Sequence, residues 1–451
     1  MKNMEKNDLN FFTTMIIEEE CSKPKWKDFS KLGFLSVLFL IILQSCGYSK
    51  KTDEDSIRRI EVCFSKDKLS TLYASEFISD IEYVCLETSP ECFIGDNQKI
   101  CLSDNYILIF SMGDSRCLLF SRQGEFLRHI GNKGQGPREY VLEPSRLYID
   151  EESNMIYLSS IFELLAYRIT GEFVKKLNLN ELTKKAGISR NLWNVTYWKD
   201  DLFCSNVDLS TGKEPYSFVI FTLDGDIVKL FPNHLIFDSE VTFGGINFSA
   251  DIYNFNGQLS FMRGGSDTLF RLNEQMEFVP ELIFDLCGRE IPTHRRGKRD
   301  SPSTYTYSSI LMETENYLLL HCNFGDKKFS DLSTFYCLYD KNRNKPTIVK
   351  PEYVRDRIII GYDGKERKVK AYFSGFINDL DGGPNMLFSF YSDRGQIISS
   401  IYPYFLLTKD YSEGKTVIHP EWHQRYQTLL TNLDEEDNTV LMISHFKIKS
   451  D

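Results

Sequence analysis

Short apolar runs alternate with polar turns along most of the chain, and one arrangement of them recurs. Two apolar strands joined by a polar turn are followed by an aromatic residue, a glycine turn and a further strand. The stretches "LLFSRQGEFLRHI" (118–130) and "LAYRITGEFVKKL" (165–177) match closely, and "FVIFTLDGDIVKLF" (218–231) repeats the pattern. Short apolar runs bounded by turn residues predict β-strands. Only two short stretches, 179–187 and 422–433, have helical periodicity.

The repeat has a period of roughly forty to fifty residues, which is that of a four-stranded propeller blade. Six units can be aligned, at 98–130, 145–177, 193–231, 249–279, 308–349 and from 374 onward. Because one blade cannot bury both of its faces, blades stack around an axis. We therefore expect an all-β fold, a six-bladed β-propeller of four-stranded antiparallel blades. Pairing of the final strand, "TVLMISHFK", with an N-terminal strand such as Ile57–Ser65 would close the ring and remove two sheet edges.

Three glycines, Gly131, Gly134 and Gly136, fall within six residues and raise the question of a phosphate-binding loop. A dinucleotide loop needs G-x-G-x-x-G between a strand and a helix. Here the spacing is reversed, Pro137 follows at once, and the next residues read as extended chain. We therefore predict a tight turn between an outer strand of one blade and an inner strand of the next.

Three stretches carry a family resemblance: "SEFISDIEYVCLETSPECFIGDNQKI", "GNKGQGPREY" and the terminal "EEDNTVLMISHFKIK". They resemble the six-bladed β-propeller lipoproteins of Bacteroides-type bacteria, NHL-like propellers of uncharacterised function. The departures are Arg138, where the loop usually has Gly, and Thr439, where the closing strand often has Pro. The resemblance covers nearly all of the chain after its N-terminal segment, and it implies the propeller fold and an envelope location.

The N-terminal segment has the pattern of a lipoprotein signal peptide. Its apolar part, Leu32–Leu43, is about twelve residues long, too short for a helix to cross a bilayer core of about 30 Å. Lysines precede it, and it ends in Leu-Gln-Ser-Cys, which resembles a bacterial lipobox with Cys46 as the lipidated residue. The alternative interpretation is a buried helix that happens to end in Ser-Cys.

We therefore expect residues 1–46 to be an N-terminal extension and signal peptide, 47–56 a flexible tether and 57–451 the propeller. The protein would be anchored to the outer membrane of the cell envelope through the lipid on Cys46. The lysine-then-acid order after Cys46 favours the outward-facing leaflet.

Charge and cysteine content narrow the function further. The net charge of −11 has no long basic block beside it, which excludes nucleic acid as the expected partner. The basic cluster His294–Asp300 is interpreted as a solvated loop. The eleven cysteines are scattered and show no C-x-x-C spacing, so most are expected to be free core thiols. One disulfide among Cys85, Cys92 and Cys101 is left open.

No G-x-S-x-G motif is present, and the seven histidines are dispersed, so no nucleophile elbow is indicated. Polar residues expected near the axial opening are Gln98, Arg146, Asn194, Asp251 and Asn378, and Arg138 is expected on the loop face. Propellers of the gluconolactonase kind bind a divalent cation at the axis with Glu, Asn and Asp. Asn194, Asp251 and Asn378 could imitate part of that set, although polar residues also line wet channels without a metal.

The sequence thus predicts a lipid-anchored, monomeric binding module without a cofactor, whose ligand is a peptide, a glycan or a partner outer-membrane protein. The alternative is a metal-dependent hydrolase or lactonase that acts at the propeller axis. A convergent Asn/Asp/Glu cluster there would favour this alternative.

Overall fold

The computed structural model describes residues 57–65, 68–95, 97–209, 211–238, 250–292, 305–324, 334–351, 353–360, 366–388 and 395–448. The chain divides into two units, 1–56 and 57–451. The expected signal segment, the lipidation site Cys46 and the tether lie outside the described residues, as does the basic cluster His294–Asp300. No helix of the described part is long and apolar enough to span a membrane.

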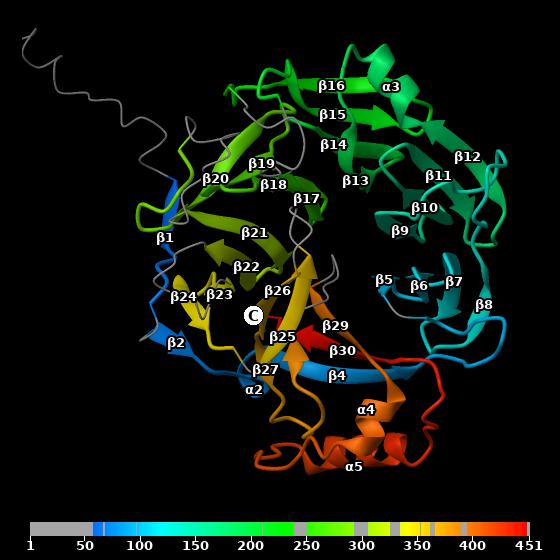
Figure 1. The fold of residues 1–451 in the computed structure, drawn as a ribbon, viewed down its shortest axis with the longest axis vertical. Coiled ribbons are helices and arrows are strands. Elements are labelled where there is room, and N and C mark those ends of the chain that lie inside the picture. The colour runs from blue at the N-terminus through cyan, green and yellow to red at the C-terminus, as the bar shows by residue number, and fades with distance from the viewer. Residues whose placement is uncertain are drawn as a thin grey trace, which may run out of the picture. The chain divides into compact units, whose positions relative to one another are not determined.

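The described residues of the unit 57–451 form sheets arranged as the blades of a ring, antiparallel except for three N-terminal edge strands (Figure 1). Three blades each take four consecutive strands. The first is β5 (Gln98–Leu102), β6 (Tyr106–Ser111), β7 (Arg116–Ser121) and β8 (Phe126–His129). The second is β9 (Arg146–Asp150), β10 (Met155–Ser159), β11 (Glu163–Arg168) and β12 (Phe173–Asn178). The third is β13 (Leu192–Lys199), β14 (Leu202–Val207), β15 (Tyr216–Thr222) and β16 (Ile227–Pro232).

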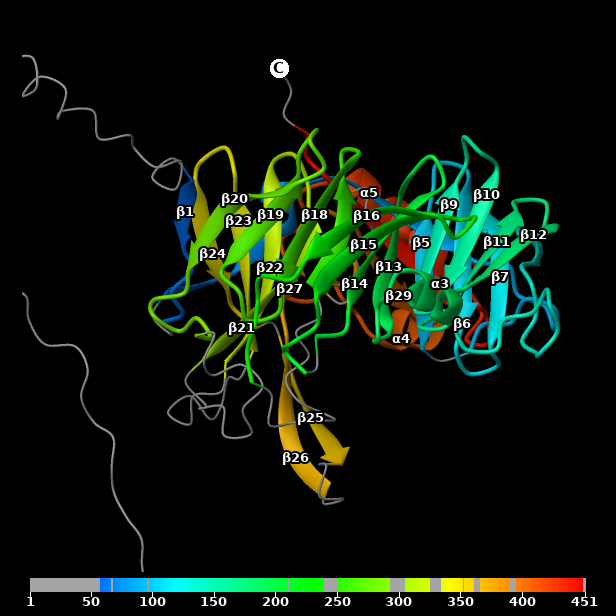
Figure 2. The ribbon, with the colours of Figure 1, turned by 90° about the horizontal axis from the view of Figure 1, so that it is seen from above.

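Two further blades gain a fifth strand. The fourth blade is β17 (Ala250–Phe255), β18 (Gln258–Arg263), β19 (Thr268–Leu272) and β20 (Phe278–Asp285), with β1 (Arg58–Glu61) on its outer edge. The fifth is β21 (Thr306–Glu313), β22 (Tyr317–Phe324), β23 (Thr334–Asp340) and β24 (Lys345–Val349), with β2 (Leu69–Ser70) outside. A hairpin, β25 (Tyr353–Ile360) and β26 (Glu366–Phe373), follows the fifth blade and projects from the ring (Figure 2).

The predicted number of six blades is wrong, because the described strands form seven. The segment expected to be one sixth blade contributes to two three-stranded sheets. One consists of β28 (Met386–Leu387), β27 (Gly375–Ile377) and β3 (Leu72–Tyr73). The other consists of β29 (Gln396–Ile401), β30 (Val440–Phe446) and β4 (Ile78–Cys85). Each sheet is completed by an N-terminal strand, and a repeat count along the chain does not reveal such long-range partners.

The ring closes by pairing N-terminal and C-terminal strands, but the N-terminal partner differs from the predicted one. Strand β30 pairs antiparallel with β4, from Val440 opposite Cys85 to Ser444 opposite Ile81. The expected partner, Ile57–Ser65, instead contributes β1, which pairs parallel with β20. Residues 57–65 and β4 are both short stretches with interspersed apolar residues, so the sequence pattern alone does not select the partner.

Residues 57–65 and 68–77, called here the N-terminal strap, run along the outside of three successive sheets. β1, β2 and β3 pair parallel with β20, β24 and β27 in turn. Ile60 and Val62, each 2% exposed, pack into the core between the fourth and fifth blades, and Leu72 and Phe77 pack into the next core. The strap therefore ties neighbouring blades together from the rim. It ends in the short helix α2 (Ala74–Phe77) before β4.

Helices are few, as expected. α3 (Leu179–Lys185) begins where the Asn178 side chain accepts hydrogen bonds from the backbone N–H groups of Asn180 and Glu181, an N-cap. α4 (Pro403–Thr408) and α5 (Pro420–Leu430) lie at the outer rim in the connection from β29 to β30 (Figure 1). α3 and α5 match the two helical patterns of the sequence, whereas α4 was not predicted.

The glycine-rich stretch is a turn between β8 and β9, as predicted. The N–H of Gly134 donates to the Tyr140 carbonyl, and the N–H of Tyr140 donates to the Asn132 carbonyl. The Glu139 carboxylate accepts the N–H of Gly136 at 2.8 Å. The loop's own carboxylate thus occupies the place that a bound phosphate would need.

Candidate ligand-binding site at the propeller axis

The first strands of four blades, β5, β9, β13 and β17, lie around the centre of the ring (Figure 1). Their side chains border a cavity of about 850 Å³. The polar residues that line it along these strands include Gln98, Lys99, Arg146, Asn194, Tyr197 and Asn254. Carboxylates lie where the first strands end, at Asp104, Asp150, Glu151 and Glu152. The cavity therefore has cationic and amide groups along the strands and acidic groups at one end.

Gln98 opens β5 and bridges to the closing blade. Its Oε1 accepts the Ser400 hydroxyl at 2.9 Å, and its Nε2 donates to the Gly95 carbonyl at 3.3 Å. Beside it, the Lys99 ammonium donates to the Pro144 carbonyl at 2.5 Å. Burial lowers the pKa of Lys99, while the charge of Glu143 acts in the opposite direction. The Gln98–Ser400 bond joins the first blade to the last, whereas the Lys99–Pro144 bond joins the first blade to the connection that leads into the second.

The charge of Arg146 acts on the Asp251 carboxyl, although β13 lies between their strands. Burial raises the pKa of the Asp251 carboxyl to about 6, and the positive charge of Arg146 partly offsets this. A carboxyl with such a pKa changes its charge close to neutral pH. Arg146 begins β9 and Asp251 is the second residue of β17, so the start of the first strand in each blade places both.

Asn194 occupies a β-bulge. Its φ of 53° lies in the left-handed region, and the pairing of β13 with β14 shifts register between Trp193 and Thr196. The bulge directs its Nδ2 to the Ala250 carbonyl on β17 at 3.1 Å. Thr196 and Asn254 make two more side-chain bonds between β13 and β17. The carbonyl oxygen of the Asn254 side chain is buried and has no hydrogen-bond partner among the described residues.

At the acidic end, tyrosines hold the carboxylates. The Tyr197 hydroxyl donates to Asp150 at 2.6 Å, the Tyr157 hydroxyl donates to Asp201, and the two rings stack with centroids 5.0 Å apart. Burial raises the pKa of Asp150, but hydrogen bonds led by that of Ser153 outweigh it, so the pKa is lowered overall. Asp150 therefore stays ionised at neutral pH and acts as a fixed acceptor.

Of the residues singled out in the sequence, Gln98, Arg146 and Asn194 line the cavity, and Asp251 lies within electrostatic reach of Arg146. Arg138 is exposed on the loop from β8 to β9, where its carbonyl accepts the Tyr167 hydroxyl at 2.9 Å. The predicted position of Asn378 near the axial opening is wrong. This residue is fully buried in the loop from β27 to β28 and bonds Asp381 and Pro384. His423 of α5 bonds the same loop, so Asn378 serves the packing of the rim.

Three further residues line the cavity but were not predicted from the sequence: Lys99, Tyr197 and Asn254. Each lies on the first strand of a blade, as the predicted residues do, and an aligned comparison of first strands could have pointed to them. The partners that define the site lie across blades, as with the bond from Asn254 to Trp198. Such contacts depend on how blades stack, which no single repeat encodes.

A second feature is the loop face, defined here as the side of the ring that carries connections between blades and between second and third strands. Antiparallel pairing puts both kinds of connection on one side, opposite the tight turns. Exposed large apolar side chains occur on these connections at Phe93, Val141, Leu142, Phe162 and Ile236. Among the described residues of the five larger blades, the tight turns of the opposite side carry none.

Comparison with known proteins gives a family and a fold. The family described as "Domain of unknown function (DUF4934)" matches residues 57–445. No curated protein matches the chain. A solved protein of Bacteroides fragilis NCTC 9343, described as exported, is 18% identical and has a TM-score of 0.55, with 86% of this chain and 100% of that chain covered. A DUF4221 family member from Bacteroides vulgatus ATCC 8482 is 12% identical and has a TM-score of 0.41, with 83% of this chain and 98% of that chain covered. The first similarity establishes a shared fold alone.

Proposed function

The chain belongs to the DUF4934 family, and we propose that this member is a non-enzymatic binding module of the cell envelope whose ligand occupies the axial cavity. The observation that carries the proposal is the convergence of amide, guanidinium and phenol groups from four blades on one cavity of about 850 Å³. That volume lies in the range of about 300–1,000 Å³ typical of ligand sites.

The unpartnered oxygen of Asn254 favours a ligand that donates hydrogen bonds. A buried acceptor without a partner costs about 1–3 kcal/mol, and a ligand hydroxyl or amide N–H would recover this energy. The fixed carboxylate of Asp150 is a second acceptor on the same wall. Peptides and glycans both offer such donors.

Location supports the same function. The lipobox at Cys46 predicts a lipid anchor in the outer membrane, and the similar Bacteroides fragilis protein is described as exported. Apolar side chains on the loop face provide a surface for a partner outer-membrane protein. We propose the axial cavity as the primary site because its polar groups are partly buried and several are oriented by hydrogen bonds to neighbouring strands.

A metal-dependent hydrolase is the second candidate, and one observation favours it. A carboxyl with a pKa of about 6, as at Asp251, suits general acid–base catalysis near neutral pH. Two observations oppose it: the positive charge of Arg146 already acts on Asp251 and would disfavour a cation there, and Asn378 is part of the rim. The binding function therefore ranks first.

The test begins with glycan and peptide arrays, followed by calorimetry of the best binder. Arg146→Ala should weaken binding at least about tenfold, because a charged hydrogen bond is worth about 1.5–3 kcal/mol. Arg138→Ala, a matched arginine on the loop face, should leave the affinity unchanged. If Arg138→Ala weakens binding and Arg146→Ala does not, the ligand binds at the loop face and the axial proposal is wrong.

The same preparation tests the hydrolase. Ca²⁺, Mn²⁺ and Zn²⁺ are titrated into the oxidised chain and into Asp251→Ala. We expect no stoichiometric binding that depends on Asp251. A cation bound with one-to-one stoichiometry and lost in the variant would replace the binding module by the hydrolase and direct screening to lactones and esters.

A further inference from the structure

A disulfide attaches the N-terminal strap to the fourth blade just after β1. Cys63 follows β1, Cys287 follows β20, and a disulfide joins them with Cα atoms 5.7 Å apart across 224 residues of sequence. This pairing differs from the one left open among Cys85, Cys92 and Cys101, none of which forms a disulfide. The bond lies beside the four residue pairs through which β1 joins β20.

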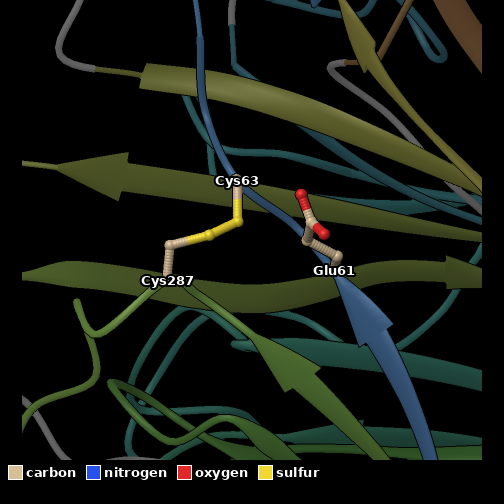
Figure 3. A group of neighbouring side chains, drawn as sticks. All are labelled: Glu61, Cys63 and Cys287. Atoms are coloured by element: carbon tan, nitrogen blue, oxygen red, sulfur yellow. A yellow bond between two sulfur atoms is a disulfide. The ribbon is translucent and has the colours of Figure 1, made fainter.

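A carboxylate faces the same sulfurs. The Glu61 carboxylate oxygen and both Sγ atoms lie within 4.8 Å of one another (Figure 3). Among the described residues, no other three His, Cys, Asp or Glu side chains converge in this way. The ion pair from Lys68 to Glu61, 3.4 Å long with both side chains more than 60% exposed, is too solvated to hold the carboxylate strongly. Glu61, Cys63 and Cys287 are called the clasp here.

The clasp is accessible to a reductant. Cys287 is exposed, Cys63 is partly exposed, and Cys287 has a φ of 59°, in the left-handed region that residues other than glycine seldom adopt. Exposed disulfides are the ones most readily reduced. Several other cysteines, such as Cys204 and Cys322, are buried, and burial raises their thiol pKa values.

We propose that the clasp has two chemical states, a disulfide and a metal–dithiolate site. A dithiol supplies two electrons and two protons, becomes a disulfide itself, and leaves Cys63 and Cys287 as thiols. A divalent cation of the zinc class then displaces both thiol protons and is held by two thiolates and the Glu61 carboxylate, with water as the fourth ligand. This donor set suits tetrahedral zinc.

The required movement is small. Two sulfurs bound to zinc at about 2.3 Å lie about 3.8 Å apart, against about 2.05 Å in a disulfide, so they separate by about 1.7 Å. Rotation of the exposed Cys287 and the partly exposed Cys63 side chains can supply this while the Cα atoms stay near their 5.7 Å separation. Both states keep β1 joined to β20. Without either, the start of the strap loses its sulfur link and keeps the four pairs of β1, the packing of Ile60 and Val62 and a few hydrogen bonds such as that from Val62 N–H to the Asp285 carbonyl.

The test is a cobalt titration of the whole chain, because Co²⁺ bound to thiolates absorbs in the near ultraviolet. The chain is reduced with dithiothreitol, exchanged into oxygen-free buffer and titrated with Co²⁺, and Zn²⁺ is then added. We expect one equivalent of Co²⁺ with a thiolate band that Zn²⁺ removes. The unreduced chain should show no band.

Variants separate the clasp from the other cysteines. Cys63→Ser and Cys287→Ser should each lose the band, whereas Cys85→Ser, which removes an exposed free thiol, should keep it. Glu61→Gln should weaken Co²⁺ binding by at least about tenfold, since even partners outside the ligand shell are worth that much. Its exposed position leaves folding intact if the cysteine variants misfold. Unchanged affinity in Glu61→Gln, or a band retained in Cys287→Ser, would overturn the proposal.

Discussion

Asp251 shows how the axis alters a single residue. Its ordinary pKa of 3.8 rises to about 6 because the carboxyl is buried. The folded state thus holds this proton more tightly than the unfolded chain does. The contribution of the protonated Asp251 carboxyl to folding stability is fully present below about pH 4 and is lost as the pH rises through 6.

We therefore expect the stability of Asp251→Asn relative to the wild type to increase as the pH is raised from 4.5 to 7.5. The gain should be about 2 kcal/mol, since one pKa unit corresponds to about 1.4 kcal/mol. Urea unfolding of both proteins at both pH values measures it, with the exposed Asp80→Asn as the control for the substitution itself. An equal difference between variant and wild type at the two pH values would contradict the raised pKa.

Gly131 tests the glycine-rich turn. Its φ is +64°, and a Cβ there would collide with the Tyr167 ring. Gly131→Ala should cost about 1 kcal/mol for the left-handed backbone and about 1–3 kcal/mol more for the collision. Gly187→Ala is the matched control, because its φ is +67° and nothing lies within 4 Å of the added Cβ. Equal urea midpoints for the two variants would mean that the turn accommodates the added Cβ at position 131 without loss of stability.

At the scale of elements, the N-terminal strap decides how the blades are tied together. Ile60→Ala removes a side chain that is 2% exposed and packs in the core shared by the fourth and fifth blades. Such a change should cost about 2–5 kcal/mol in global unfolding free energy. Exposed Arg59→Ala should stay within about 0.5 kcal/mol of the wild type. If Ile60→Ala leaves global unfolding unchanged, the strap detaches independently of the ring.

At the scale of the whole molecule, the anchor predicted at Cys46 determines where the binding site operates. Cys46→Ser should abolish fatty-acid labelling and move the protein from the detergent phase to the aqueous phase on phase separation. Cys21→Ser, upstream of the apolar segment, should change neither. Labelling that persists in Cys46→Ser would place the lipid on another residue and refute the lipobox.

The sequence by itself determined the features that depend on neighbours along the chain. Short apolar runs and glycine turns such as those at Gly124 and Gly171 produce antiparallel strands, and their regular spacing identified a propeller. Of the residues singled out on first strands, Gln98, Arg146 and Asn194 line one cavity, whereas the same reasoning failed for Asn378.

Only the tertiary structure decided what depends on distant partners. The blade count, the choice of β4 over β1 to close the ring, the bond from Cys63 to Cys287 and the rim position of Asn378 all join segments that the sequence does not relate. Several strands are short apolar runs of the same kind, so the pattern leaves their pairing degenerate. Packing between blades, such as that of Ile60 in the core shared by the fourth and fifth blades, removes that degeneracy.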